Sequence, residues 1–136
     1  MATDCPFCRI AAGDEDAHVV HRDERTVAFL DADPAAEGHA LVVPTDHVVG
    51  LVDVDGATAA ALFSTAQTVA GAIDRVLEPD GFSVFHTTGT LVGRVEHAHL
   101  HLIPRWTEDF IHVGLERRPV DDQAAERLAA RIRAGK

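Results

Sequence analysis

The stretch Glu96-His97-Ala98-His99-Leu100-His101-Leu102-Ile103-Pro104 places histidine at alternate positions between apolar residues. Because successive side chains of a β-strand point to opposite faces, this pattern predicts one strand with three imidazoles on one face and apolar residues facing a core. Neighbouring rings on that face would lie about 7 Å apart, close enough to share a phosphate-sized ligand, or a metal ion if the strand curves. The chain holds nine histidines, so isolated ones such as His18, His21 and His112 are more simply read as surface residues.

Other elements are predicted on both sides of this stretch. Apolar and β-branched runs between turn residues predict strands at 19–20, 26–30, 39–44, 82–85 and 98–103. Helical spacing of apolar residues predicts helices at 6–12, 59–77 and 121–133. Strands in a run, one long helix and short connections favour an α+β fold: a five-stranded, mainly antiparallel sheet with one long helix and a shorter C-terminal helix.

Length and composition limit the class of protein. A chain of 136 residues with 46% hydrophobic residues is expected to form a single domain over 1–136. Its formal net charge of −10 argues against nucleic-acid and membrane partners, which are gripped by Lys and Arg. Polar residues interrupt the longest uncharged run, 56–73, which is therefore read as a helix of a non-membrane protein. Residues 1–4 lack the pattern of a signal peptide, so a cytoplasmic location is expected.

The two cysteines form a Cys-x-x-Cys pair, Cys5-Pro6-Phe7-Cys8, with three interpretations. A redox dithiol is expected between a strand and a helix of a βαβ unit, which this N-terminal position does not offer. A structural zinc ion needs two more ligands, and His47 and His97 are available. Two unconnected reduced thiols are the third interpretation, and the pair alone leaves it open.

The segment from Thr87 to Arg94, just before the histidines, combines glycines, hydroxyls and one guanidinium. Glycines let backbone N–H groups approach an oxyanion, and an arginine grips phosphate through paired donors. The segment therefore predicts a phosphate cradle that includes Thr88 and Arg94. The alternative is an ordinary hairpin turn in which Arg94 pairs with Glu96 or Asp109.

These residues resemble the histidine triad superfamily, in its hint-like branch, whose motif is HxHxH followed by two apolar residues. The stretch from His97 to Ile103 matches that motif at every position. The similarity extends to Cys5-x-x-Cys8, Phe29-x-Asp31-x-x-Pro34, Gly38-His39-Ala40-Leu41-Val42-Val43-Pro44, His47 and Pro104-Arg105-Trp106. It covers about 5–106 and leaves 107–136 as a C-terminal extension.

The resemblance implies a nucleotide hydrolase or transferase. The middle histidine, His99, would attack the α-phosphate of a purine nucleotide phosphoramidate or dinucleoside polyphosphate and form a nucleotidyl-histidine intermediate. To do so its other ring nitrogen must carry a proton that is donated to a neighbour. His101 would donate to the phosphate and shuttle a proton to the leaving group.

The resemblance also implies binding residues, a cofactor and a partner. Asp31 would accept hydrogen bonds from the ribose hydroxyls. The base would contact a set of apolar side chains that could equally belong to the hydrophobic core: Phe7, Ile10, Phe29 and Leu30. Structural zinc would be bound by Cys5, Cys8, His47 and His97. Active members are usually homodimers, joined through the long helix and a sheet edge.

Two other functions compete with this one. In the first, His97, His99 and His101 bind one catalytic metal ion and the cysteines are incidental. In the second, the chain is a nucleotide-binding regulatory protein with weak catalysis. The segment before the histidines favours the second, because hydrolytic relatives usually carry an Asn-bearing loop and a Gly-Gln or Gln-Ser phosphate grip where this chain has Thr87-Thr88 and Gly93-Arg94.

Overall fold

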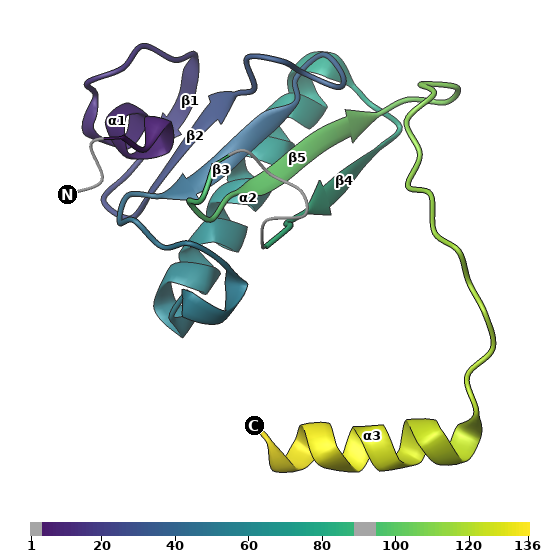
Figure 1. Cartoon of the computed structure of the whole chain (residues 1–136). Coiled ribbons are helices and arrows are strands. Elements are labelled where there is room, and N and C mark those ends of the chain that lie inside the picture. The colour runs from purple at the N-terminus through teal and green to yellow at the C-terminus, as the bar shows by residue number, and fades with distance from the viewer. Residues whose placement is uncertain (1–3, 89–94) are drawn as a thin grey trace.

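One five-stranded antiparallel sheet organises the molecule, and the expected α+β fold is confirmed (Figure 1). The computed structural model describes residues 4–88 and 95–136. The strands are β1 (Val19–Arg22), β2 (Thr26–Leu30), β3 (Ala40–Pro44), β4 (Gly81–Phe85) and β5 (Leu100–Arg105). They lie in the order β1-β2-β3-β5-β4. The helices are α1 (Pro6–Ala12), α2 (Gly56–Leu77) and α3 (Asp122–Ala134), and a 3-10 turn spans Leu51–Asp53.

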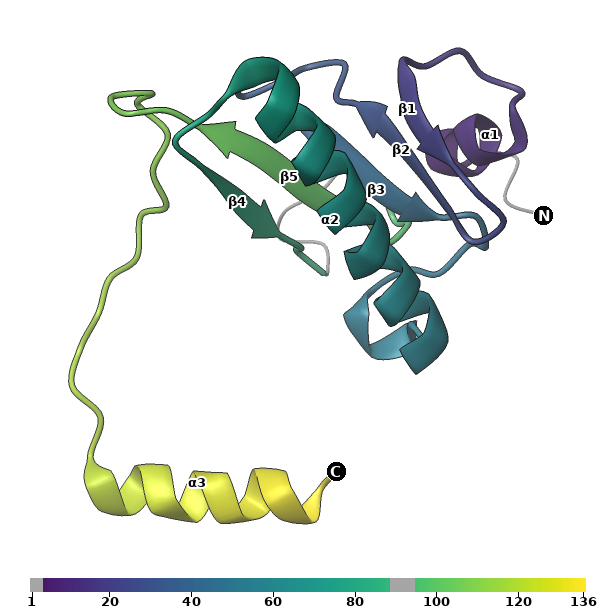
Figure 2. The ribbon, with the colours of Figure 1, turned by 180° about the vertical axis from the view of Figure 1, so that it is seen from behind.

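The period-two pattern of the central strands divides the core between the two faces of the sheet. On one face α2 covers small and branched side chains that include Ala28, Val42 and Leu102 (Figure 2). On the other face α1 packs its Phe7 and Ile10 against the intervening positions of β2 and β3. Because His101 lies between Leu100 and Leu102 on β5, its side chain points away from α2, towards the α1 side.

The helix boundaries follow from local chemistry. Asp55 caps α2 by accepting from the Thr58 backbone N–H at 2.7 Å, so the helix begins three residues before the predicted start at 59. Gly13, at φ 82°, ends α1 as predicted, because glycine tolerates the left-handed conformation. None of the described helices has the length and apolarity that a membrane span requires.

The predicted strand at 98–103 is wrong at both ends, since β5 runs from Leu100 to Arg105. His97 and His99 therefore precede the strand, and only His101 belongs to it. Two hydrogen bonds hold the backbone here outside the pairing with β3: the Ala98 N–H donates to the Val48 carbonyl at 2.6 Å, and the His99 ring lies 2.7 Å from the His97 carbonyl oxygen. The three imidazoles consequently do not form one row on a strand face.

Candidate active site and metal centre

A cleft of about 780 Å³ opens on the face of the sheet opposite α2. Both predicted catalytic residues, His99 and His101, line it together with Asp31. The apolar residues predicted to wall the base also line it: Phe7, Ile10, Phe29 and Leu30. Its size suits a drug-sized ligand, and its described lining residues include no Lys or Arg.

The ring of His99 is oriented for nucleophilic attack. Its Nδ1 lies 2.7 Å from the carbonyl oxygen of His97, so Nδ1 carries the proton and donates it to that oxygen. The lone pair then lies on Nε2. A nucleophilic histidine needs this arrangement, in which the other ring nitrogen carries the proton. Phe7 packs edge-on against the ring with centroids 5.1 Å apart, and this contact holds the ring at the cleft.

His101 is fixed by a chain of hydrogen bonds that runs through His39. The Ala35 backbone N–H donates to His39 Nδ1 at 3.0 Å, so the proton of the neutral His39 ring must lie on Nε2. That Nε2–H donates to His101 Nδ1 at 2.9 Å. His101 consequently carries its own proton on Nε2, where it can serve as a donor to an anion. Phe85 of β4 stacks on the His101 ring with centroids 4.6 Å apart.

Burial and neighbouring rings keep these histidines neutral. Desolvation lowers the pKa of His99 and, together with His99 and His39, lowers the pKa of His101 to about 4. The hydrogen bond from His39 also explains why the pKa of His101 is lowered, because a proton on His101 Nδ1 would face the Nε2–H of His39. Burial likewise lowers the pKa of His39.

Asp31 lies at the end of β2 with its carboxylate already oriented. Its Oδ1 accepts from the Asp33 backbone N–H at 2.8 Å, and its Oδ2 lies 3.5 Å from His39 Nε2. Both oxygens keep unused acceptor sites, because an ionised carboxylate offers about four. The carboxylate can therefore take hydroxyl donors from a ligand in the cleft.

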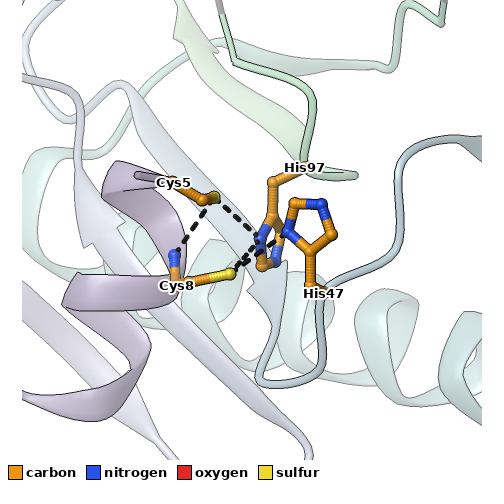
Figure 3. A group of neighbouring side chains, drawn as sticks. All are labelled: Cys5, Cys8, His47 and His97. Carbon is orange, nitrogen blue, oxygen red and sulfur yellow. Dashed lines mark hydrogen bonds between the residues drawn. The ribbon is translucent and has the colours of Figure 1, made fainter. Parts of the chain in front are cut away.

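A second cluster joins the N-terminus to two distant histidines (Figure 3). Cys5 Sγ lies 3.3 Å from His97 Nδ1, and Cys8 Sγ lies 3.2 Å from His47 Nδ1 and 3.3 Å from His97 Nδ1. His97 is fully buried at 0% exposure, and its Nε2–H donates to the Pro44 carbonyl at 2.9 Å. This bond leaves Nδ1 unprotonated and aimed at the thiols.

The cluster fits a structural zinc ion. The four donor atoms lie within 4.8 Å of one another, and ligands at zinc bond lengths on a tetrahedron are separated by about 3.5 Å. Burial and the neighbouring Cys5 raise the pKa of Cys8 to about 11, so the second thiolate requires a cation beside it. The bond from His97 to Pro44 is the kind of support that zinc-bound histidines usually have.

Of the two predicted phosphate-binding residues, the structure describes only Thr88. The Thr88 hydroxyl lies 2.7 Å from His86 Nε2 and 3.3 Å from the Leu51 backbone N, and Thr88 does not line the cleft. Arg94 and the rest of segment 89–94 lie outside the described residues. The predicted cradle therefore stays a prediction.

Sequence reasoning missed two histidines. His39 was placed in a predicted strand and in the matching motif without a role of its own, and the structure shows it 5% exposed, where a polar ring needs a partner. His86 was not singled out, yet its Nδ1 lies 2.9 Å from the carbonyl oxygen of His99. His18 is exposed, as interpreted from the sequence, and it also lines the cleft.

The alternative of one metal ion bound by His97, His99 and His101 is not supported. Among the described residues, the groups that could hold an ion are Cys5-Cys8-His47-His97 and Asp31-His39-His101. His99 belongs to neither group, and His97 and His101 fall in different ones.

Comparison with known proteins places this architecture in a family. The HIT domain model matches residues 12–108. Protein hit of Bacillus subtilis is 36% identical over 77% of this chain and 73% of its own length. The adenosine 5'-monophosphoramidase hnt1 of Schizosaccharomyces pombe is 28% identical over 94% and 95%, and the adenylylsulfatase HINT3 of Arabidopsis thaliana is 28% identical over 98% and 70%.

Solved structures agree with the sequence comparison. A HIT family protein from Bacillus anthracis matches with a TM-score of 0.91 at 30% identity, covering 98% of both chains. A zinc-bound histidine triad family protein from Mycobacterium smegmatis matches with a TM-score of 0.77 at 31% identity, covering all of both chains. With the family model spanning most of its length, the chain belongs to the histidine triad (HIT) family.

Proposed function

We propose that this protein hydrolyses purine nucleotide derivatives at the α-phosphate, through a nucleotidyl intermediate on His99. The carrying observation is the hydrogen bond from His99 Nδ1 to the His97 carbonyl, which leaves Nε2 as a free nucleophile in the cleft. Phosphoramidates and dinucleoside polyphosphates are the substrate classes. The S. pombe and A. thaliana relatives are named as an adenosine 5'-monophosphoramidase and an adenylylsulfatase, which supports an adenylyl compound as substrate.

The reaction has two displacement steps. In the first, His99 Nε2 attacks the α-phosphorus, a phosphorus–nitrogen bond forms, and the bond to the leaving group breaks with its electron pair. In the second, water attacks the same phosphorus, the bond to His99 breaks, and the nucleoside monophosphate leaves. His99 Nδ1 keeps its proton throughout and donates a hydrogen bond to the His97 carbonyl, which stabilises the positive charge on the modified ring.

His101 binds the phosphate and carries the proton. Its Nε2–H is the donor left over by the bond to His39, so it can meet a phosphate oxygen. A bound phosphate anion opposes the effects that lower the pKa of His101, because an opposite charge favours the protonated ring. His101 then gives a proton to the leaving group in the first step and takes one from water in the second.

The nucleoside lies along the α1 side of the cleft. Asp31 accepts the ribose hydroxyls, and the purine contacts the apolar wall formed by Phe7, Ile10, Phe29 and Leu30. Cys5, Cys8, His47 and His97 would hold a zinc ion, which would cross-link these segments and would leave His99 free to react. In this proposal Arg94 contacts the phosphates, while Thr88, which does not line the cleft, supports His86.

Incubation with an adenosine phosphoramidate under single-turnover conditions tests the proposal. Rapid acid-free quenching and intact-mass analysis should reveal a chain heavier by one adenylyl group, and peptide mapping should assign it to His99. The His99→Ala protein should bind the nucleotide, keep its zinc and form no adduct. Micromolar nucleotide affinity without adduct or turnover would instead support the regulatory protein with weak catalysis.

The assembly proposed for the active protein is a homodimer joined through α2 and a sheet edge. Phe63 on α2 is exposed and available for such a contact, whereas Leu62 and Val69 are buried in the core of this chain. The expected cytoplasmic location stays a prediction.

A further inference from the structure

The Cys-x-x-Cys pair is placed to form a disulfide as well as to bind a metal ion (Figure 3). Cys5 is the N-cap of α1, and the Cys8 backbone N–H donates to Cys5 Sγ at 3.4 Å. Both sulfurs lie 3.3 Å from His97 Nδ1 and within 4.8 Å of each other. A disulfide joins sulfurs about 2 Å apart, and side-chain rotation at the start of a helix closes that distance in redox-active Cys-x-x-Cys motifs.

The pair is isolated from other thiols and open to small oxidants. Cys5 and Cys8 are the two cysteines of the chain, so each is the other's intramolecular partner. Both are half-buried, and His47 beside them is exposed. Once the sulfurs are joined, only the two neutral histidines of the ligand set remain. Zinc is held far less tightly by two neutral ligands than by four ligands that include two thiolates, so oxidation would release the ion.

Phe7 lies between the two cysteines in the sequence and connects them to the cleft. Its side chain is 9% exposed, and its ring packs edge-on against His99 and Phe29, with centroids 5.1 and 5.5 Å away. Phe7 also lines the cleft. Because its backbone belongs to the same helical turn as Cys8, drawing the two sulfurs together shifts the segment that carries this ring. The state of the thiols therefore affects the cleft wall.

We infer that Cys5 and Cys8 form an oxidation site: hydrogen peroxide converts the zinc-bound pair to a disulfide, releases the ion and weakens nucleotide binding through Phe7. One thiolate attacks a peroxide oxygen, the O–O bond breaks, and a sulfenic acid and hydroxide form. The second thiolate attacks the sulfenic sulfur, the S–S bond forms, and a second hydroxide leaves. Two protons from the buffer convert the hydroxides to water. The sulfurs lose two electrons and peroxide gains them.

The oxidation rests on the zinc site of the proposed function and not on the reaction at His99. In a reducing compartment the pair would stay reduced until an oxidant appears, and a thiol reductant would reverse the step by exchange.

Metal and mass measurements on the zinc-loaded, full-length protein test the oxidation. Peroxide should release zinc, detected with a chromogenic chelator, while the chain becomes lighter by two hydrogen atoms and peptide mapping joins Cys5 to Cys8. Dithiothreitol should restore both thiols and zinc binding. Release of zinc without this disulfide would overturn the inference, as would a pair that keeps its zinc in excess peroxide.

Two variants separate the disulfide from the loss of a ligand. Aspartate caps helices and binds zinc but cannot form a disulfide, so Cys5→Asp should keep its zinc at a peroxide concentration that empties the wild type. His47→Ala removes an exposed ligand and keeps both thiols, so it should lose zinc and still form the disulfide. Equal release of zinc from Cys5→Asp and wild type would contradict expulsion of the ion by the disulfide.

AMP binding tests the connection to the cleft. Zinc-loaded and chelated proteins with reduced thiols should bind AMP with similar affinity, because the bond from His97 to Pro44 does not need the metal. The disulfide form should bind AMP about fivefold more weakly, as expected for one aromatic contact. In Phe7→Leu, which lacks the ring, reduced and disulfide forms should differ less.

Equal AMP affinity of the reduced and disulfide forms of the wild type would overturn the role of Phe7. Absence of AMP binding in every form would instead contradict the proposed function, and the zinc and mass measurements would still decide whether the pair is an oxidation site.

Discussion

His86 Nδ1 lies 2.9 Å from the carbonyl oxygen of His99. The other ring nitrogen, Nε2, lies 2.7 Å from the Thr88 hydroxyl, which in turn lies 3.3 Å from the Leu51 backbone N. One consistent set of protons has Leu51 N–H donating to Thr88, Thr88 donating to His86 Nε2, and His86 Nδ1–H donating to His99. His99 precedes β5, so sheet hydrogen bonds do not hold its backbone. This series of hydrogen bonds restrains the His99 carbonyl instead.

Replacing His86 should therefore slow turnover while leaving nucleotide affinity nearly intact. The lost hydrogen bond is worth about 1 kcal/mol, so His86→Leu should reduce kcat roughly fivefold with little change in KM. Asparagine retains a side-chain donor, and His86→Asn should recover part of the rate. An equal rise of KM in both variants would assign His86 to substrate binding instead.

Asp31→Ala should weaken binding of ribonucleotides through the loss of a charged acceptor for the ribose. Such hydrogen bonds contribute about 1.5–3 kcal/mol, so KM should rise by roughly one to two orders of magnitude with kcat less affected. The control is a 2′,3′-dideoxy substrate, for which wild type and variant should have similar KM values. A similar penalty with the dideoxy substrate would show that Asp31 acts through His39 rather than on the sugar.

Acid should destabilise the protein through His101, whose pKa is lowered from 6.5 to about 4 in the folded state. Between pH 6.5 and pH 4 the unfolded chain binds a proton at His101 more readily than the folded chain does. The contribution of His101 to the free energy of unfolding is therefore complete above pH 6.5 and is lost as the pH falls towards 4. Urea titrations at pH 7.5 and pH 5 measure the stability that each protein loses on acidification. Wild type should lose about 1 kcal/mol more than His101→Gln, allowing for partial exposure of the ring. Identical losses would assign the acid sensitivity to other buried histidines.

Zinc should raise stability without taking part in bond breaking. Purified protein should contain stoichiometric zinc, and at a free concentration about a hundred times its Kd the ion should add about 2.7 kcal/mol to the free energy of unfolding. Cys8→Ser should lose the metal and that increment. Below the melting transition, chelated protein should still form the adduct on His99. Loss of adduct formation in chelated protein that remains folded would contradict a purely structural role.

The sequence predicts the sheet well because the patterns that define it are local. The period-two runs of β2 and β3 face a helix on each side, and a turn residue bounds each strand, so composition and spacing are sufficient. The β5 boundary was wrong because the bond from Ala98 to Val48 and the ring–backbone bond at His99 are tertiary and local-geometry effects that alternation does not contain.

The sites depend on contacts between distant segments. Cys8 and His97 are 89 residues apart, and the Cys-x-x-Cys pair by itself left a shared zinc site as one of three interpretations until the family resemblance favoured it. The role of His39 beside His101, 62 residues away, was missed because an alternating strand pattern gives no partner for a buried ring. Residue type alone does not tell whether an apolar side chain such as Phe7 belongs to the core or to the cleft wall. In the structure Phe7 packs in the core and also lines the cleft.

His97 belongs to two sites at once, since its ring faces the thiols and its carbonyl accepts the hydrogen bond from His99 Nδ1–H. A substitution at position 97 therefore confounds two effects, loss of a metal ligand and displacement of the residue that fixes the nucleophile's tautomer. Variants of Cys5, Cys8 or His47 alter only the first, so a comparison of these variants with His97 variants would measure how far metal occupancy controls the alignment of His99.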